Sequence, residues 1–150
     1  MVKLLIVVGL PGSGKSTFIE NRLSKGEFPG TYFDEFMANA IDDVHEFKQS
    51  RHYGILIKQL QGGQNCVIAD ISFCLKGKRD EAVEAIREKV VAVDIQWKFF
   101  ENSPAKCIKN VLRSGSPAMA NKIYYINLFS GKYRIPDGIE AEEIWQEPLN

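Results

Sequence analysis

Residues Leu4–Thr17 read LLIVVGLPGSGKST, and this stretch decides the fold. An apolar run leads directly into the pattern Gly-x-x-x-x-Gly-Lys-Ser, which begins at Gly9. In a loop of this pattern the backbone N–H groups cradle the α- and β-phosphates of a nucleotide. Glycines are needed because the chain wraps tightly around the anion. The helical pattern from Phe18 to Leu23 completes the strand, loop and helix that the motif requires, so the sequence predicts a nucleotide-binding loop.

The roles within this loop follow from the chemistry of phosphates. Lys15 is expected to reach the β- and γ-phosphates and to stabilise charge during phosphoryl transfer, which makes it a candidate catalytic residue. The Ser16 hydroxyl is expected to bind Mg²⁺. A helix that starts near Lys15 adds a favourable dipole and N–H donors. The residues expected to bind the nucleotide are Gly9, Pro11, Gly12, Ser13, Gly14, Lys15, Ser16 and Thr17.

Composition points to a globular chain that is neutral overall. The 150 residues suit a single domain over residues 1–150, and 19 basic residues balance 19 acidic ones. This balance gives no overall attraction to nucleic acid or to an anionic membrane. No apolar run approaches the length that spans a bilayer. The three cysteines lack metal-ligand spacing and are expected to be reduced, buried thiols in a cytoplasmic protein.

Apolar runs alternate with helical patterns along the chain, which predicts an α/β fold with a parallel sheet covered on both faces. Gly54 interrupts the longest helical pattern, Ile41–Leu60, so this segment is expected to form either one helix or two. Ser103-Pro104 predicts a helix start and Gly115 its end. The expected strands are Leu4–Val8, Thr31–Phe33, Cys66–Ala69 and Val91–Phe99, with a final one near Ile144.

Two aspartates follow expected strands, where ligands bind in open parallel sheets. Asp34 follows Thr31–Phe33, where it could accept the proton of an attacking hydroxyl group or simply cap the next helix. Asp70 follows Cys66–Ala69, where it could hold Mg²⁺ or its water shell, or simply belong to a turn. We interpret Asp34 as a catalytic base and Asp70 as a metal-binding carboxylate.

Arg113 closes the expected helix that begins at Pro104. It could stabilise the helix C-terminus by its charge, or open a mobile lid over about residues 113–134 and cover the transferring phosphate. We interpret it as a catalytic lid residue. The other candidate anion contacts are expected to be solvated surface charges; they are Arg51, Lys76, Lys78 and Arg79, with Arg79 the best placed of them.

Taken in order, these motifs resemble the small P-loop kinases of the polynucleotide-kinase-like group. The resemblance covers most of the chain and rests on Gly9–Thr17, on Tyr32–Asp34, on Val67–Ser72 followed by Arg79, and on Phe99-Phe100 leading to the Ile108–Arg113 helix. It implies a three-layer αβα P-loop NTPase fold, a five-stranded sheet of order 2-3-1-4-5, a small helical lid, ATP as donor and Mg²⁺ as cofactor. By position it makes Asp34 the hydroxyl-activating aspartate, Asp70 the aspartate ending the third strand, and Arg113 a lid arginine.

Two departures bear on the acceptor. Met37 stands where phage-type polynucleotide kinase has an arginine that contacts a nucleic-acid phosphate, and Lys109-Asn110 occupies a region where relatives often carry another arginine. Both changes remove phosphate contacts. A polynucleotide 5′-end, a nucleoside and a small metabolite therefore all stay open as acceptors, with no membrane partner and no obligate protein partner expected.

Three functions fit these residues. The leading hypothesis is an ATP-dependent phosphotransferase with an alcohol group as acceptor. A nucleoside monophosphate kinase would need arginines rather than a carboxylate facing its acceptor, and Arg51 and Arg79 leave it open. A nucleotide-binding ATPase or switch that acts through a protein partner would need only the loop.

Overall fold

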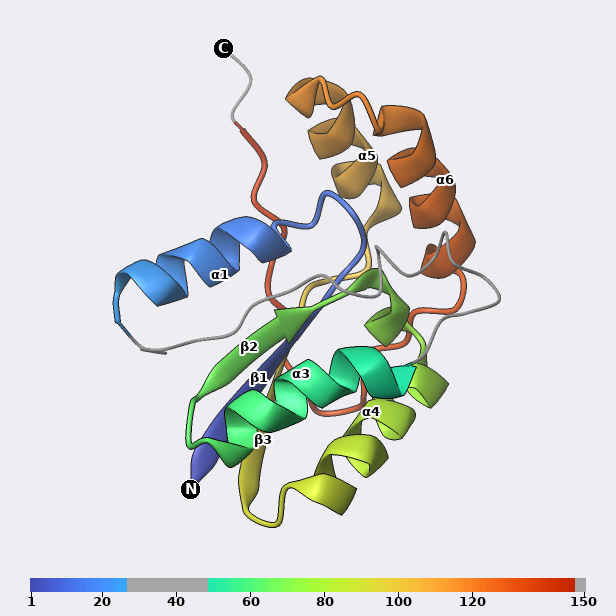
Figure 1. Cartoon of the computed structure of the whole chain (residues 1–150). Coiled ribbons are helices and arrows are strands. Elements are labelled where there is room, and N and C mark those ends of the chain that lie inside the picture. The colour runs from blue at the N-terminus through green and yellow to red at the C-terminus, as the bar shows by residue number, and fades with distance from the viewer. Residues whose placement is uncertain (27–48, 148–150) are drawn as a thin grey trace.

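The apolar run at the start of the chain forms β1 (Val2–Val8), the central strand of a parallel sheet (Figure 1). In this computed structural model, which describes residues 1–26 and 49–147, β1 lies between β2 (Cys66–Ala69) and β3 (Val93–Phe99). Both neighbours run parallel to β1. The three strands therefore point their carboxyl ends to the same edge of the sheet, where the loop after β1 begins.

The core is built around β1 because its side chains are covered on both faces. Leu4–Val8 are buried, as are all four residues of β2, which explains why both strands are continuous apolar runs rather than alternating ones. In β3 the ends are buried and the middle is less so. The strand that leads into the predicted nucleotide-binding loop Gly9–Thr17, called the phosphate loop below, is thus covered on both faces and paired on both edges.

Helices follow the strands and pack around the sheet (Figure 1). Helix α3 packs against α4 and against β1 and β2, while α5 and α6 pack against each other beyond the carboxyl ends of the strands. The helical elements of the described residues are α1 (Lys15–Ser24), α3 (Gln49–Gln61), the 3-10 helix η1 (Ile71–Cys74), α4 (Lys76–Lys89), α5 (Pro104–Ser114) and α6 (Met119–Ser130).

Local chemistry explains where α5 begins and ends. The Ser103 hydroxyl accepts a hydrogen bond from the Lys106 N–H at 3.4 Å, and Pro104 occupies the first turn. Gly115 ends the helix with φ of 65°, a left-handed conformation that glycine adopts without a steric cost. Both predicted boundaries of this helix are confirmed.

The prediction of five strands is wrong for the described residues, which contain three. Their order β2-β1-β3 agrees with the centre of the predicted sheet. The expected strand Thr31–Phe33 lies outside the described residues. The expected last strand is reduced to a single parallel bridge between Phe100 and Glu142, because the chain then leaves the sheet edge and binds to α5 instead.

Two helical predictions also change. Helix α3 runs through Gly54 without a break between Gln49 and Gln61. The apolar spacing over Arg79–Lys89 predicts a helix there, and α4 covers this stretch but begins three residues earlier, at Lys76. No helix in the described part of the chain is long and apolar enough to cross a membrane.

Candidate nucleotide-binding site

The loop between β1 and α1 is shaped by glycines that other residues could not replace. Gly12 has φ of 81° and Gly14 has φ of 103°, both in the left-handed region. A Cβ atom on Gly12 would lie 2.6 Å from the Cys107 carbonyl oxygen in α5. A Cβ atom on Gly9 would lie 2.5 Å from the Ser13 hydroxyl oxygen. The loop is therefore packed against α5 on one side and closed on itself on the other.

Lys15 is buried at the first position of α1. Its Nζ donates hydrogen bonds to the carbonyl oxygens of Gly9, at 2.8 Å, and of Leu10, at 3.0 Å. The ammonium group is thus held across the loop by neutral acceptors. A phosphate would attract this ammonium more strongly than a carbonyl group does, because a phosphate oxygen carries negative charge whereas a carbonyl group is only a dipole.

A single cavity of about 1010 Å³ joins the loop to other parts of the chain. Its floor is the loop and the start of α1, and its walls come from the ends of β2 and β3, from α5 and α6, and from the C-terminal segment. The lining residues beyond the loop include Phe18, Asn21, Asp70, Phe100, Asn110, Arg113, Lys122, Tyr125, Glu142, Glu143, Trp145 and Glu147.

Asp70 lies at the edge of this cavity, directly after β2, and is buried. Its carboxylate accepts a hydrogen bond from the Ser72 N–H at 2.8 Å and so caps η1. The two interpretations of this residue are compatible, since the carboxylate both ends the turn and faces the same cavity as Lys15 and Ser16. The capping bond fixes the position of the carboxylate there.

Arg113 lines the cavity from the last turn of α5 and is exposed. Its guanidinium donates a hydrogen bond to the Glu147 carbonyl oxygen of the C-terminal segment. The predicted lid, residues 113–134, corresponds to the end of α5, the following turn and α6. Helix α6 adds a second cation, Lys122, which sequence reasoning missed because nothing in its helical pattern distinguishes it from a surface lysine.

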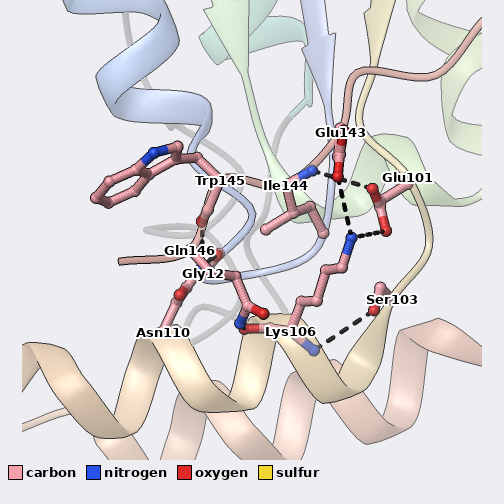
Figure 2. Close-up of polar contacts among 9 residues, drawn as sticks. All are labelled: Gly12, Glu101, Ser103, Lys106, Asn110, Glu143, Ile144, Trp145 and Gln146. Atoms are coloured by element: carbon pink, nitrogen blue, oxygen red, sulfur yellow. Dashed lines mark hydrogen bonds and ion pairs between the residues drawn. The ribbon is translucent and has the colours of Figure 1, made fainter. Parts of the chain in front are cut away.

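The C-terminal segment Glu142–Glu147 crosses the phosphate loop and is held there by side chains of α5 (Figure 2). The Asn110 amide donates two hydrogen bonds, one to the Gly12 carbonyl oxygen at 3.0 Å and one to the Trp145 carbonyl oxygen at 3.1 Å. Gln146 donates to the Lys106 carbonyl oxygen at 3.2 Å. A single asparagine side chain therefore links the loop, α5 and this segment.

An ion pair lies beside the same segment, next to Ile144 (Figure 2). Lys106 Nζ lies 2.9 Å from one carboxylate oxygen of Glu101, and the Ile144 N–H donates to the other at 3.1 Å. The hydrogen bond from Lys106 lowers the pKa of Glu101, and the N–H of Ile144 adds to this effect. In return the Glu101 carboxylate raises the pKa of Lys106. The Glu101 carboxylate thus holds the Ile144 N–H, and Lys106 holds the carboxylate.

The prediction that Arg79 is a solvated surface charge is wrong. Its side chain is buried and donates to the Phe73 carbonyl oxygen at 2.7 Å and to the Arg134 carbonyl oxygen at 3.2 Å. The guanidinium also lies over the Phe99 ring, 5.3 Å from its centre. Arg79 thus connects η1, α4 and the segment after α6, and it does not line the cavity at the phosphate loop.

The cysteines are free and buried, as predicted. Burial raises the pKa of the Cys74 thiol to about 12, although the nearby charges of Lys15 and Arg79 act in the opposite direction. Burial likewise raises the pKa of the Cys107 thiol to about 11. Both groups are therefore neutral near pH 7. Among the described residues, no group of three or more His, Cys, Asp or Glu side chains is arranged to hold a metal ion.

The described residues fit a bound nucleoside triphosphate with Mg²⁺. The loop has the left-handed glycines and the buried ammonium group that a polyphosphate needs. Ser16 and Asp70 line one cavity and carry oxygen atoms of the kind that Mg²⁺ prefers as ligands. Asp34, the expected catalytic base, and Met37 lie outside the described residues, as does the side chain of Arg51.

Comparison with known proteins supports the fold. No family model matches the chain. It is 28% identical over 109 residues, 73% of this chain and 70% of the other, to the uncharacterized protein R277 of Acanthamoeba polyphaga mimivirus. Among solved structures it resembles a chain of the Pnkp1/Rnl/Hen1 RNA repair complex, with a TM-score of 0.58 and 21% identity over 93% of this chain. It spans about half of that protein, 49% of its length.

A second solved structure, a gluconokinase from Sinorhizobium meliloti 1021, matches over 97% of this chain and 84% of its own length. The TM-score is 0.59 and the identity is 12%. The described residues therefore have an α/β fold with a parallel sheet that is similar to the fold of these two structures. The phosphate loop follows the central strand of this sheet.

Proposed function

We propose that this protein is an ATP-dependent kinase that transfers the γ-phosphoryl group to a hydroxyl acceptor. The observation that carries the proposal is the single cavity that brings the phosphate loop, Asp70 and the cations Arg113 and Lys122 together. A loop alone would suit any nucleotide-binding protein. Cations from a helical pair beyond the loop are what phosphoryl transfer needs, because negative charge spreads over the oxygens of the transferred group.

Each lining residue has a role in this proposal. Lys15 exchanges its bonds to the Gly9 and Leu10 carbonyl groups for bonds to phosphate oxygens. Ser16 and Asp70 would hold Mg²⁺, which would partly neutralise the charge of the phosphates when ATP is bound. Arg113 leaves the Glu147 carbonyl group and turns to the transferred group, while Lys122 adds positive charge from α6. Closing α5 and α6 over the loop would exclude water.

The hydroxyl acceptor rests on Asp34, which we propose as the general base. A carboxylate that accepts the proton of an attacking hydroxyl group increases its nucleophilicity at the moment of transfer. The likeness to a gluconokinase and to a chain of an RNA repair complex supports both small and polymeric acceptors. The zero net charge of the chain favours the small ones, because binding to nucleic acid draws mainly on positive charge.

The test is ADP formation with a panel of acceptors: sugar acids, nucleosides, nucleoside monophosphates, and RNA and DNA oligonucleotides with a 5′-hydroxyl end. One hydroxyl acceptor should stimulate ADP formation in the wild-type protein. Lys15→Met should reduce both the stimulated and the unstimulated rate, because both need the phosphates bound. Asp34→Asn should reduce the stimulated rate by roughly 10²- to 10⁴-fold, the usual contribution of a general base.

Matched controls separate these effects from general damage. Lys25→Met removes an exposed lysine just after α1, and Asp137→Asn removes an exposed aspartate far from the loop. Both variants should keep the wild-type rates. Stimulation by monophosphates alone would contradict the hydroxyl acceptor, and slow ADP formation that no acceptor stimulates would favour an ATPase or switch instead.

A further inference from the structure

Trp145 is a large aromatic residue that is exposed to solvent, and packing of the core does not explain this exposure. Its side chain is 73% exposed, although its neighbour Ile144 is 2% exposed and packs into the core. Leaving an indole ring in water forgoes a large hydrophobic stabilisation. Trp145 is nevertheless one of the residues that line the cavity at the phosphate loop, so its exposed ring stands beside a candidate binding site.

The backbone of Trp145 is held in place relative to the phosphate loop. Asn110 bonds the Trp145 carbonyl oxygen and the Gly12 carbonyl oxygen with the two hydrogens of one amide group. On either side, the Ile144 N–H is bonded to Glu101 and the Gln146 side chain to α5. The indole is therefore an exposed ring on a fixed support, which is what a rigid stacking surface requires.

The direction of the ring also fits a nucleoside. Figure 2 shows the indole extending from the C-terminal segment on the side away from α5, below the helix that follows the loop. The cavity wall there includes Thr17, Phe18 and Asn21 from the start of α1. In a loop of this pattern the lysine serves the β- and γ-phosphates, so the nucleoside must leave from the α-phosphate, away from the lysine.

We propose that Trp145 stacks on the base of the nucleotide. The proposal rests on the proposed function, since it requires the loop to bind a nucleoside triphosphate. Stacking on an aromatic ring is tolerant of base identity, because every base has a π-face. Trp145 then contributes affinity for the nucleoside part and none for the phosphates. Asn110 is a positioning residue that keeps the ring at a fixed distance from the loop.

The decisive experiment compares two ligands, ATP and inorganic tripolyphosphate, by titration calorimetry on the full chain with Mg²⁺. Trp145→Ala should weaken ATP binding by roughly 10- to 100-fold, the usual effect of removing one stacking ring. The same variant should bind tripolyphosphate as the wild-type protein does. Trp145→Phe should keep most of the ATP affinity because a ring remains. GTP should show the same losses as ATP.

Fluorescence provides an independent readout, since the chain has two tryptophans. Trp97 stacks on Phe99 within β3 and does not line the cavity, so Trp97→Phe leaves Trp145 as the single indole. ATP should quench or shift its emission, and tripolyphosphate should leave the emission nearly unchanged. Asn110→Ala should reduce this ATP response by loosening the support of the ring.

The outcomes separate the stacking proposal from the proposed function. If the wild-type protein and Trp145→Ala bind ATP equally well, the stacking proposal is wrong and nucleotide binding stands. If Trp145→Ala loses ATP and tripolyphosphate to the same extent, the residue supports the loop and the stacking proposal is also wrong. If the wild-type protein binds neither ligand, both proposals fail together.

Discussion

Gly12 shows how one residue connects the loop to the rest of the fold. Its φ of 81° lies where residues with a side chain are strained, and the Cys107 carbonyl oxygen and the Val111 side chain occupy the space a Cβ atom would need. Its own carbonyl oxygen accepts the bond from Asn110. Gly12 thus adopts a backbone conformation that favours glycine, packs against α5 and accepts the hydrogen bond from Asn110 that also supports the C-terminal segment.

We expect Gly12→Ala to destabilise the protein more than Gly63→Ala. Both positions have the same backbone conformation, with φ of 81° and 84°, but no atom lies within 4 Å of a Cβ on Gly63. Gly63→Ala should cost about 1–2 kcal/mol of unfolding free energy for the backbone alone. Gly12→Ala should cost about 1–3 kcal/mol more for the forced shift of α5. Urea denaturation measures the unfolding free energy of both variants. Equal losses of unfolding free energy would mean that α5 shifts away from a Cβ atom at Gly12 at little cost.

The sequence identified the glycines of the loop but could not supply this second reason for Gly12. The motif shows that the loop must approach an anion, whereas the contact with Cys107 depends on where α5 lies. Arg79 illustrates the same limit. Its charge predicts a solvated surface position, and its place soon after a strand end makes it the best of the candidate anion contacts. The carbonyl groups of Phe73 and Arg134 that accept its hydrogen bonds come together only in the folded chain.

Among the elements, the C-terminal segment departs furthest from the sequence-based expectation. Helix α5 could be predicted at both ends because Ser103, Pro104 and Gly115 act locally. The expected last strand could not be excluded from the sequence, because the side chains that bond to its backbone, Glu101 and Asn110, are distant in sequence. The segment forms one bridge to the sheet at Glu142. Two residues later, the Ile144 N–H donates to the Glu101 side chain instead of to a neighbouring strand. Tertiary hydrogen bonds to side chains thus replace the sheet ladder.

This support should depend on pH through Glu101. Because its pKa is lowered in the folded protein, its contribution is complete above the ordinary value of 4.5 and is lost as the pH falls below it. The pKa of Lys106 is raised, so its contribution is lost as the pH rises beyond the ordinary value of 10.5. Glu101→Gln should therefore lower the urea midpoint between these pH values, by an amount that shrinks as the pH falls below 4.5.

Glu140→Gln is the matched control, since this exposed carboxylate precedes the same segment. It should leave the urea midpoint close to the wild-type value over the whole pH range. A difference between wild type and Glu101→Gln that does not shrink as the pH falls below 4.5 would mean that the Glu101 charge is not what holds Ile144.

At the scale of the whole molecule, the cavity joins segments from both ends of the described chain, so a ligand there should stabilise the entire fold. At a concentration 100 times its dissociation constant, Mg²⁺–ATP should add about 2.7 kcal/mol to the unfolding free energy. For a chain of this size we expect a rise in melting temperature of about 5–10 °C. Calorimetry or circular dichroism would measure it.

Lys15→Met should abolish most of this rise, and the exposed-site variant Lys25→Met should retain it. A rise that survives in Lys15→Met would place the nucleotide elsewhere than on the loop. The comparison is informative because the Lys15 ammonium lies at the loop, where it would attract the negative charge of the phosphates, whereas Lys25 follows the end of α1.

The central position of β1 also sets the order of events as the chain is made. Val2 pairs with Val93, and Leu4 pairs with Cys66, so β1 leaves the ribosome well before the strands with which it pairs. Contacts so far apart in sequence slow folding, because loop entropy is lost before they form. The phosphate loop rests on Phe100 and Cys107, so a nascent chain that ends before them has no surface on which to shape it. Nucleotide binding during synthesis should therefore begin abruptly, once α5 has emerged.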